Sequence, residues 1–246
     1  MSPTFCSMTG LLLWMALTSA AHAGISLSST RLVFNEGRKE ESLVVRNDGG
    51  EILVQSWLEP AAGVEVRDLP FVVTPPLIRV APKQQQLLRI MYSGAGMPTD
   101  KESIFWLNVQ EIPQSTDAEN ALQFAIRQRI KVFYRPKGLL GEPIQAATKL
   151  QWKLQRNSEA FELSVSNSGP YYVSLVDLDL EQGLQKVRLA EVQMLAPGAS
   201  VILPLDKVKG SAGVVLNFGS MNDHGGRDLY SVKLLEGQVA VANAKE

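Results

Sequence analysis

The sequence predicts an all-β protein built from two immunoglobulin-like sandwiches in series. Short runs of β-branched or alternating apolar and polar residues, separated by turn residues, follow one another along almost the whole chain. No segment of a dozen residues has the apolar spacing of an amphipathic helix. A stretch rich in glycine and proline, residues 136–143, interrupts the pattern near the middle and is the expected linker.

The first 23 residues are expected to be a secretory signal peptide. The apolar run LLLWMALTSA is too short to cross a membrane, and Ala21-His22-Ala23 has the small residues of a cleavage site. No lysine or arginine precedes the run, so the prediction rests on the run and the cleavage site alone. We expect cleavage after Ala23, export to the periplasm, and a mature chain of 223 residues without cysteine, because Cys6 is the only one.

Residues 24–137 are predicted to form the first sandwich domain. They contain seven strand candidates, the number found in an immunoglobulin-like sandwich. Each candidate is bounded by turn residues. The candidates are residues 25–35, 40–47, 51–60, 71–82, 84–93, 102–113 and 122–136.

The last of these candidates, LQFAIRQRIKVFYRP at residues 122–136, is unusually long. As a strand it would place Leu122, Phe124 and Ile126 on an apolar face and a stripe of arginine and lysine on the other face. At roughly 3.3 Å per residue it would extend about 50 Å, which is too long to be buried throughout in a sandwich of about 100 residues. It is therefore either a core strand with solvated basic residues, or a strand whose exposed edge pairs with another chain.

Residues 138–246 are predicted to form the second sandwich domain, with residues 239–246 as a loose tail. Length alone would also allow one large β domain, but the break at residues 136–143 favours two. The strand candidates of this half are residues 149–157, 160–167, 171–180, 186–195, 200–205, 212–222 and 227–236.

The sequence offers no catalytic constellation, so we predict a protein that is not an enzyme and uses no cofactor. The predicted mature chain has one histidine, His224, and no cysteine, which excludes a zinc site of the usual His/Cys kind. His224 lies in Asn-Asp-His-Gly-Gly, which is typical of a turn. Asp177 and Asp179 share one face of a strand candidate, which favours a solvated face over a glycosidase pair. No nucleotide-binding motif occurs, and a net charge of −1 argues against a nucleic-acid partner.

A set of motifs distributed over nearly the whole mature chain resembles one family. The motifs are Ser29-Thr30-Arg31, Thr74-Pro75-Pro76, SIFWLN at 103–108 followed by Glu111-Ile112-Pro113, IKVFYRP at 130–136, GPYYV at 169–173 and NDHGGR at 222–227. Together, in this order, they are similar to the periplasmic chaperones of the chaperone–usher pilus pathway, the PapD type. The resemblance implies two sandwiches in an L-shaped arrangement around a cleft. It also implies that the protein binds pilus subunits and delivers them to an outer-membrane usher without ATP.

The resemblance further implies which residues bind the subunit. Arg31 and Lys131 match two cleft cations that grip the C-terminal carboxylate of a subunit. Leu122, Phe124 and Ile126 match the apolar residues of the donor strand, which occupies the groove left by the strand that the subunit lacks. The short segment before this strand, residues 114–121, resembles the short-loop branch of the family.

Glu102, Arg135 and Asp223 match an ionic triad that joins the two domains in this family. An arginine with two carboxylate partners can hold a fixed angle between domains, since its guanidinium has donors in a planar fork. Tyr171 and Tyr172 are expected to pack within the second domain.

The main alternative is a fimbrial structural subunit or adhesin built of tandem sandwiches. Such a subunit would carry an N-terminal donor extension and lack its own last strand. This chain instead has the Arg31 motif near its mature N-terminus and an intact candidate strand at residues 122–136. Self-association through the apolar edge of that strand is a further expected interaction.

Overall fold

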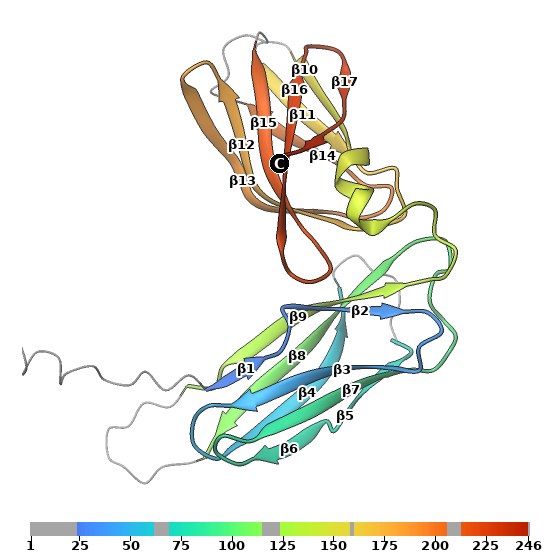
Figure 1. Cartoon of the computed structure of the whole chain (residues 1–246), viewed down its shortest axis with the longest axis vertical. Coiled ribbons are helices and arrows are strands. Elements are labelled where there is room, and N and C mark those ends of the chain that lie inside the picture. Colours follow the sequence, from blue (N-terminus) through green and yellow to red (C-terminus); the bar gives the residue numbers. More distant parts are fainter. Residues whose placement is uncertain (1–23, 62–68, 115–123, 158–159, 206–212, 246) are drawn as a thin grey trace, which may run out of the picture.

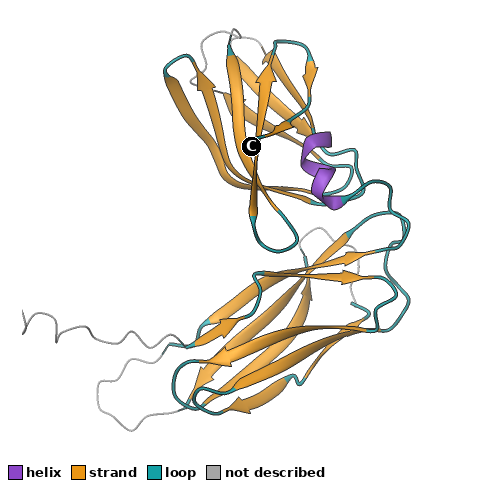
Figure 2. Cartoon of the chain, viewed as in Figure 1, coloured by secondary structure: helices purple, strands orange, loops and turns teal. Residues whose placement is uncertain are grey.

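The computed structural model describes residues 24–61, 69–114, 124–157, 160–205 and 213–245. It consists of two β sandwiches, with one short helix beside the junction between them (Figures 1 and 2). The predicted all-β fold of two sandwiches is confirmed. No helix in these ranges is long and apolar enough to cross a membrane.

Two sheets make up the first sandwich, and one of them contains a parallel strand pair. One sheet has the strand order β1-β3-β7-β5 and the other has the order β2-β9-β8-β4-β6. Strand β2 runs parallel to β9, whereas the other pairs are antiparallel. The strands are β1 (Ile25–Leu27), β2 (Arg31–Asn35), β3 (Glu40–Asn47), β4 (Ile52–Pro60), β5 (Phe71–Thr74), β6 (Leu77–Val80), β7 (Gln85–Tyr92), β8 (Ser103–Pro113) and β9 (Arg127–Arg135).

Two of the strand candidates are split in the structure, and each contributes to both sheets. Residues 25–35 form β1 in one sheet and β2 in the other. The turn between them is held by the Ser29 hydroxyl, which bonds with the backbone of Arg31 and so competes with continued strand pairing. Residues 71–82 divide in the same way at Pro75 and Pro76, which cannot donate to a strand ladder.

Alternating residues of both sheets fill the core of the first sandwich. Ile130, Val132 and Tyr134 of β9 are buried in it, as the period-two pattern predicts. Phe71 packs against other aromatic rings of this core. Its ring centroid lies 4.5 Å from that of Phe105 and 4.7 Å from that of Tyr92. This apolar layer fixes the position of β9, and therefore which of its side chains point outward.

The second sandwich has sheets with the orders β14-β11-β10-β17 and β13-β12-β15-β16-β18. Its core surrounds Trp152 and Phe218, whose rings are 5.2 Å apart. The 3-10 helix η1 (Pro143–Lys149) precedes it, with proline at its start. The strands are β10 (Gln151–Asn157), β11 (Ala160–Ser166), β12 (Val173–Gln182), β13 (Gln185–Leu195), β14 (Ser200–Leu205), β15 (Val214–Met221), β16 (Arg227–Leu234), β17 (Val239–Ala240) and β18 (Asn243–Ala244).

The second sandwich corrects two expectations from the sequence. Residues 239–245 are not a loose tail, because β17 pairs with β10 and β18 pairs with β16. Asp177 and Asp179 do not form a solvated face, since both bind the guanidinium of Arg188 and Asp179 is only 8% exposed. The register shift in β12 between Leu178 and Asp179 brings the two carboxylates to one arginine.

Candidate functional site

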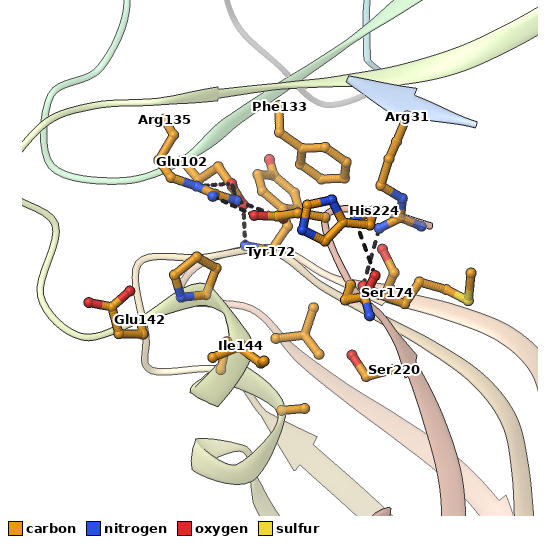
Figure 3. A pocket seen from close by; sticks show the side chains of 17 residues that line it. Arg31, Glu102, Phe133, Arg135, Glu142, Ile144, Tyr172, Ser174, Ser220 and His224 are labelled. Carbon is orange, nitrogen blue, oxygen red and sulfur yellow. Dashed lines mark hydrogen bonds and ion pairs between the residues drawn. The ribbon is translucent and has the colours of Figure 1, made fainter. Parts of the chain in front are cut away.

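A cavity of about 230 Å³ lies where the two sandwiches meet (Figure 3). The first sandwich lines it with residues of β2 and β9 and with the residue that precedes β8. The second sandwich lines it with residues of η1, the start of β12 and the turn between β15 and β16. Several of the residues singled out from the sequence line this cavity: Arg31, Glu102, Arg135 and Asp223.

Arg135, the last residue of β9, connects the two sandwiches. Its Nη2 and Nε donate to Oε1 of Glu102 at 2.8 and 3.0 Å, and its Nη1 and Nη2 donate to the two carboxylate oxygens of Asp223 at 2.7 and 3.0 Å. Glu102 belongs to the first sandwich, whereas Asp223 belongs to the second. Burial lowers the pKa of the guanidinium, but the hydrogen bonds and charges of the two carboxylates outweigh burial and raise the pKa above its ordinary value.

Glu102 precedes β8 and is tied to the second sandwich by two hydrogen bonds. Its side chain is only 2% exposed, and burial raises the pKa of its carboxyl, although the Arg135 charge opposes this. Oε2 accepts a hydrogen bond of 2.8 Å from the backbone N–H of Tyr172. Its own backbone N–H donates to the carbonyl of Pro170 at 2.8 Å. A buried carboxylate that accepts from both sides is therefore a rigid joint between the sandwiches.

Asp223 is presented by the tight turn between β15 and β16. The side-chain oxygen of Asn222 accepts from the backbone N–H groups of His224 and Gly226, which closes the turn. Gly225 has a φ of +80°, and a Cβ there would lie 2.7 Å from the hydroxyl of Thr30. The turn therefore needs glycine both for its backbone and for its close approach to the first sandwich.

Arg31 and Lys131 are direct neighbours across the parallel pair of β2 and β9. Nη1 of Arg31 donates to the carbonyl of Met221 at 3.2 Å, and its guanidinium lies 5.8 Å from the ring centroid of Phe133. Its Nε is buried and has no hydrogen-bond partner within the described part of the chain. Figure 3 shows the Arg31 side chain reaching from β2 toward the second sandwich.

The charges of Arg31 and Lys131 are not neutralised by a direct ion pair with any carboxylate of the described residues. Burial lowers the pKa of the Arg31 guanidinium, and the charges of Asp223 and Glu102 oppose the effect only from a distance. Burial and the positive charge of Arg31 both lower the pKa of the Lys131 ammonium. Two half-buried cations side by side repel each other, and each has lost part of its hydration. An anion bound between them would reduce the repulsion and compensate for the lost hydration.

The other basic residues of β9 are held by aromatic rings. The guanidinium of Arg129 lies 4.6 Å from the ring centroid of Trp106 and forms an ion pair of 3.3 Å with Glu59. The guanidinium of Arg127 lies 5.9 Å from the ring of Trp57. These contacts account for part of the predicted basic stripe as packing on the outer face of the sheet.

Part of β9 has an open edge. The pairing with β2 begins at Lys131, and in the described chain no strand pairs with residues 127–130 on the side away from β8. The N–H of Glu111 in β8 donates to the carbonyl of Ile126 at 3.0 Å. Because backbone groups of alternate residues point to opposite sides of an antiparallel strand, those of Arg127 and Arg129 point to the open edge.

The predicted donor residues lie at the start of this edge, and here the strand prediction was wrong. Strand β9 begins at Arg127 instead of residue 122, and residues 124–126 are not in a strand. Phe124 and Ile126 are 68% and 51% exposed, because the core of the sandwich ends at Ile130 on this face. Leu122 lies outside the described residues.

Sequence reasoning missed the apolar part of the junction. Phe133 faces the second sandwich, and its ring centroid lies 6.2 Å from that of Tyr172. Tyr172 therefore packs across the junction and not only within the second sandwich, which corrects the expectation from the sequence. Tyr171 is buried, donates its hydroxyl hydrogen to the carbonyl of Gly141, and lies 5.5 Å from the Arg135 guanidinium. The sequence contained one indication of this contact: Phe133 is an aromatic residue on the face of the strand that otherwise carries basic residues.

Comparison with known proteins assigns each half of the chain to a family. Residues 24–140 match the family described as pili and flagellar-assembly chaperone, PapD N-terminal domain. Residues 145–232 match the family described as pili assembly chaperone PapD, C-terminal domain. Both families are chaperones rather than a class of enzymes.

Individual relatives cover almost the whole chain. The chaperone protein FimC of Escherichia coli strain K12 is 38% identical over 231 residues, which cover 90% of this chain and 90% of FimC. The crystal structure of the YadV chaperone is 35% identical with a TM-score of 0.72, and the match covers 85% of this chain and 98% of that one. A chain from the structure of the Salmonella enterica SafA pilin in complex with the SafB chaperone is 25% identical with a TM-score of 0.69, covering 92% and 99%.

Proposed function

Because the chain belongs to the PapD family of pilus-assembly chaperones, we propose that it captures pilus subunits in the periplasm and delivers them to an outer-membrane usher. The observation that carries this proposal is the open edge of β9 beside two cations without ion-pair partners in the described chain. An open edge can supply backbone hydrogen bonds to an incomplete sheet. The cations can bind a terminal carboxylate. No catalytic step and no cofactor is part of the proposal.

The anchor for the subunit is the pair Arg31 and Lys131. A carboxylate between them would accept charge-assisted hydrogen bonds in a partly dry site, where such bonds are stronger than in water. The Nε–H of Arg31, which has no partner among the described residues, is one available donor. Because the anchor lies where β2 stops covering β9, it sets the register of the subunit chain along the open edge.

The donor segment is Leu122, Phe124 and Ile126 together with the open edge of β9. Phe124 and Ile126 are exposed, and if the segment became extended they would share a face with the core residues of β9. They would fill the apolar groove of a subunit and be replaced there by the donor strand of the next subunit, so that no ATP is needed. When no subunit is bound, the same apolar edge would pair with a second copy of the chain.

The ionic triad of Glu102, Arg135 and Asp223 is proposed to hold the two domains at a fixed angle, so that the cleft keeps its shape. We place the boundary of the two domains between residues 137 and 138. The signal peptide is proposed to end at Ala23, in keeping with the related SfaE, which is described as a periplasmic chaperone.

Replacing Ile126 with glutamate is expected to abolish capture of a subunit without unfolding the chaperone. The change puts a charge into the apolar groove of the partner, which is costly there. Ile126 is 51% exposed in the free protein, so the free energy of unfolding should change by no more than about 0.5 kcal/mol. The test is co-purification of subunits with a tagged chaperone from the periplasm of a strain that expresses a chaperone–usher operon.

The matched control for this experiment is Val192→Glu, because Val192 is 65% exposed and lies in the second sandwich. It should leave the amount of co-purified subunit unchanged. Equal capture by the parent and the Ile126→Glu variant would refute the donor role of this residue. Loss of capture in both glutamate variants would point to a general effect of added negative charge.

Subunit binding is expected to weaken at alkaline pH because of Lys131. The pKa of its ammonium is lowered by burial and by Arg31, and a bound carboxylate would raise it again. The contribution of Lys131 to binding is therefore fully present below the lowered pKa of the free chaperone, and is lost as the pH rises from there through the higher pKa in the complex. The Lys131→Arg variant should bind without this pH dependence, because a guanidinium stays charged.

The measurement uses the C-terminal peptide of a captured subunit, titrated by fluorescence anisotropy from neutral pH to about pH 10. The same peptide with a C-terminal amide is the control, and its weaker binding should not depend on Lys131. If the affinity of the parent chaperone decreases with pH as strongly for the amidated peptide as for the peptide with a free carboxylate, the carboxylate anchor is contradicted.

A further inference from the structure

The first residues of the predicted mature chain are held from three sides. The N–H of Ile25 donates to Oε2 of Glu111 at 2.9 Å. The carbonyl of Ile25 accepts from the side-chain amide of Gln128 at 2.8 Å, and the carbonyl of Gly24 accepts from the N–H of Asp48 at 3.0 Å. The beginning of β1 is thus attached to β3, β8 and β9 at once.

Glu111 is the unusual group in this arrangement. It lies in β8 and is only 7% exposed. Within the described ranges its carboxylate accepts one hydrogen bond, from Ile25, and no lysine, arginine or histidine is close enough for an ion pair. Burial of a carboxylate with a single neutral donor is energetically unfavourable, since most of its hydration is lost without a compensating charge.

The backbone of Gly24 lies directly against this carboxylate. A Cβ built on Gly24 would lie 2.0 Å from Oε2 and 2.6 Å from Oε1 of Glu111, so no other residue fits there without moving Glu111. Covalent geometry places a backbone nitrogen about 2.5 Å from the Cβ of the same residue. The nitrogen of Gly24 is therefore no more than about 4.5 Å from Oε2, which is within the range where opposite charges interact.

We propose that the Glu111 carboxylate is a binding site for the α-ammonium group of Gly24, which forms when the signal peptide is removed. In the precursor this nitrogen is part of a neutral amide. Hydrolysis of the Ala23–Gly24 bond by a signal peptidase adds one water across it, so that Ala23 leaves with the new carboxylate and Gly24 keeps the nitrogen as an ammonium ion. The inference rests on the proposed cleavage after Ala23, and does not require that the protein bind subunits.

The ion pair would order the part of the chain from which the donor segment starts. The backbone N–H of Glu111 donates to the carbonyl of Ile126, and Gln128 in β9 bonds to Ile25. The residues that fix the new amino terminus are thus the same residues that hold the donor segment beside β8. Processing of the precursor therefore completes the structure at the base of this segment.

The direct test is a titration of the α-amino group in the mature protein by NMR, with ¹⁵N-labelled glycine, in the parent and in the Glu111→Gln variant. The charged groups that face this position are Glu111 from β8 and Asp48 from the end of β3. The ordinary pKa of an α-amino group is about 7.7–8.0. We expect a value above this range in the parent, a value within it in Glu111→Gln, and a smaller decrease in the Asp48→Asn control.

A second measurement compares the midpoint of urea unfolding for chains that begin at Gly24 or at Ala23. A raised pKa in the folded state means that the stabilisation is fully present below the ordinary pKa and is lost as the pH rises through the raised value. The extra residue should therefore lower the midpoint near pH 7 in the Glu111 parent, but not in Glu111→Gln and not well above the raised pKa.

Two results would overturn the inference. One is an α-amino pKa that is the same in the parent and in Glu111→Gln. The other is a mature chain that begins at a residue other than Gly24, as determined by its intact mass. Neither result bears on subunit capture, which is measured separately by co-purification, so failure of this inference and failure of the proposed function can be told apart.

Discussion

The Lys131→Ala variant is expected to bind pilus subunits about ten to a hundred times more weakly than the parent, with an almost unchanged free energy of unfolding. A hydrogen bond to a charged group contributes about 1.5–3 kcal/mol, and each 1.4 kcal/mol corresponds to about tenfold in affinity. Lys131 has no ion pair with a described carboxylate, and its charge is opposed by Arg31 in the free protein. Removing the ammonium therefore costs the folded protein little, while the bound carboxylate loses a partner.

Lys131 tests the anchor more cleanly than Arg31 does. Arg31 also donates to the carbonyl of Met221, so its removal would disturb the junction of the sandwiches as well as the binding site. The matched control is Lys39→Ala, because Lys39 is an exposed lysine of the same sandwich. Affinity would be measured by competition for a purified subunit. A Lys131→Ala affinity within twofold of the Lys39→Ala value would contradict the anchor.

The second large effect is expected for Arg135→Ala, which should lower the free energy of unfolding by about 3–5 kcal/mol. Removal of the guanidinium leaves the Glu102 carboxylate buried, with a side-chain exposure of 2% and the N–H of Tyr172 as its remaining donor. Breaking one member of a buried pair leaves an uncompensated charge, which is the costly case. Small-angle X-ray scattering should also show a broader range of domain orientations, because Asp223 loses its partner across the junction.

Two further variants separate the buried charge from the contact itself. Asp223→Ala should cost less than about 1 kcal/mol, because the Asp223 side chain is 39% exposed and its ion pair is partly screened. The double variant Glu102→Met, Arg135→Met should recover part of the stability lost in Arg135→Ala, since no unpaired charge remains. Urea unfolding followed by tryptophan fluorescence measures all three. If Arg135→Ala and Asp223→Ala lower the free energy of unfolding equally, the buried Glu102 carboxylate is not stabilised by Arg135.

Period-two patterning in the sequence predicted most strands to within a few residues. It worked because one face of each strand is buried in a sandwich core, as for Ile130, Val132 and Tyr134 in β9. It failed where the outcome depends on a neighbour that is distant in sequence. Residues 124–126 continue the pattern of β9, but the core that would cover them has ended. Residues 239–245 have little pattern, yet β10 and β16 provide edges for them.

The junction between the sandwiches could be predicted only in part. The residues that meet there are far apart in sequence, and spacing alone does not bring Glu102, Arg135 and Asp223 together. Resemblance to a family suggested these three, and their contacts are those described above. The packing of Phe133 on Tyr172 had no such guide, because an aromatic residue on an outward face has many explanations. The position of Gly24 against Glu111 likewise follows from the fold and not from any local pattern.

The most direct test of the proposed function is hydrogen exchange at the open edge of β9. The backbone amides of Arg127 and Arg129 point away from β8 and should exchange rapidly in the free chaperone, whereas those of Gln128 and Ile130 are paired with β8. Binding of a purified subunit should slow exchange at Arg127 and Arg129 strongly, because the subunit would add a strand to this edge. If these two amides exchange equally fast in the complex, the subunit is bound elsewhere, and donor-strand complementation by β9 is wrong.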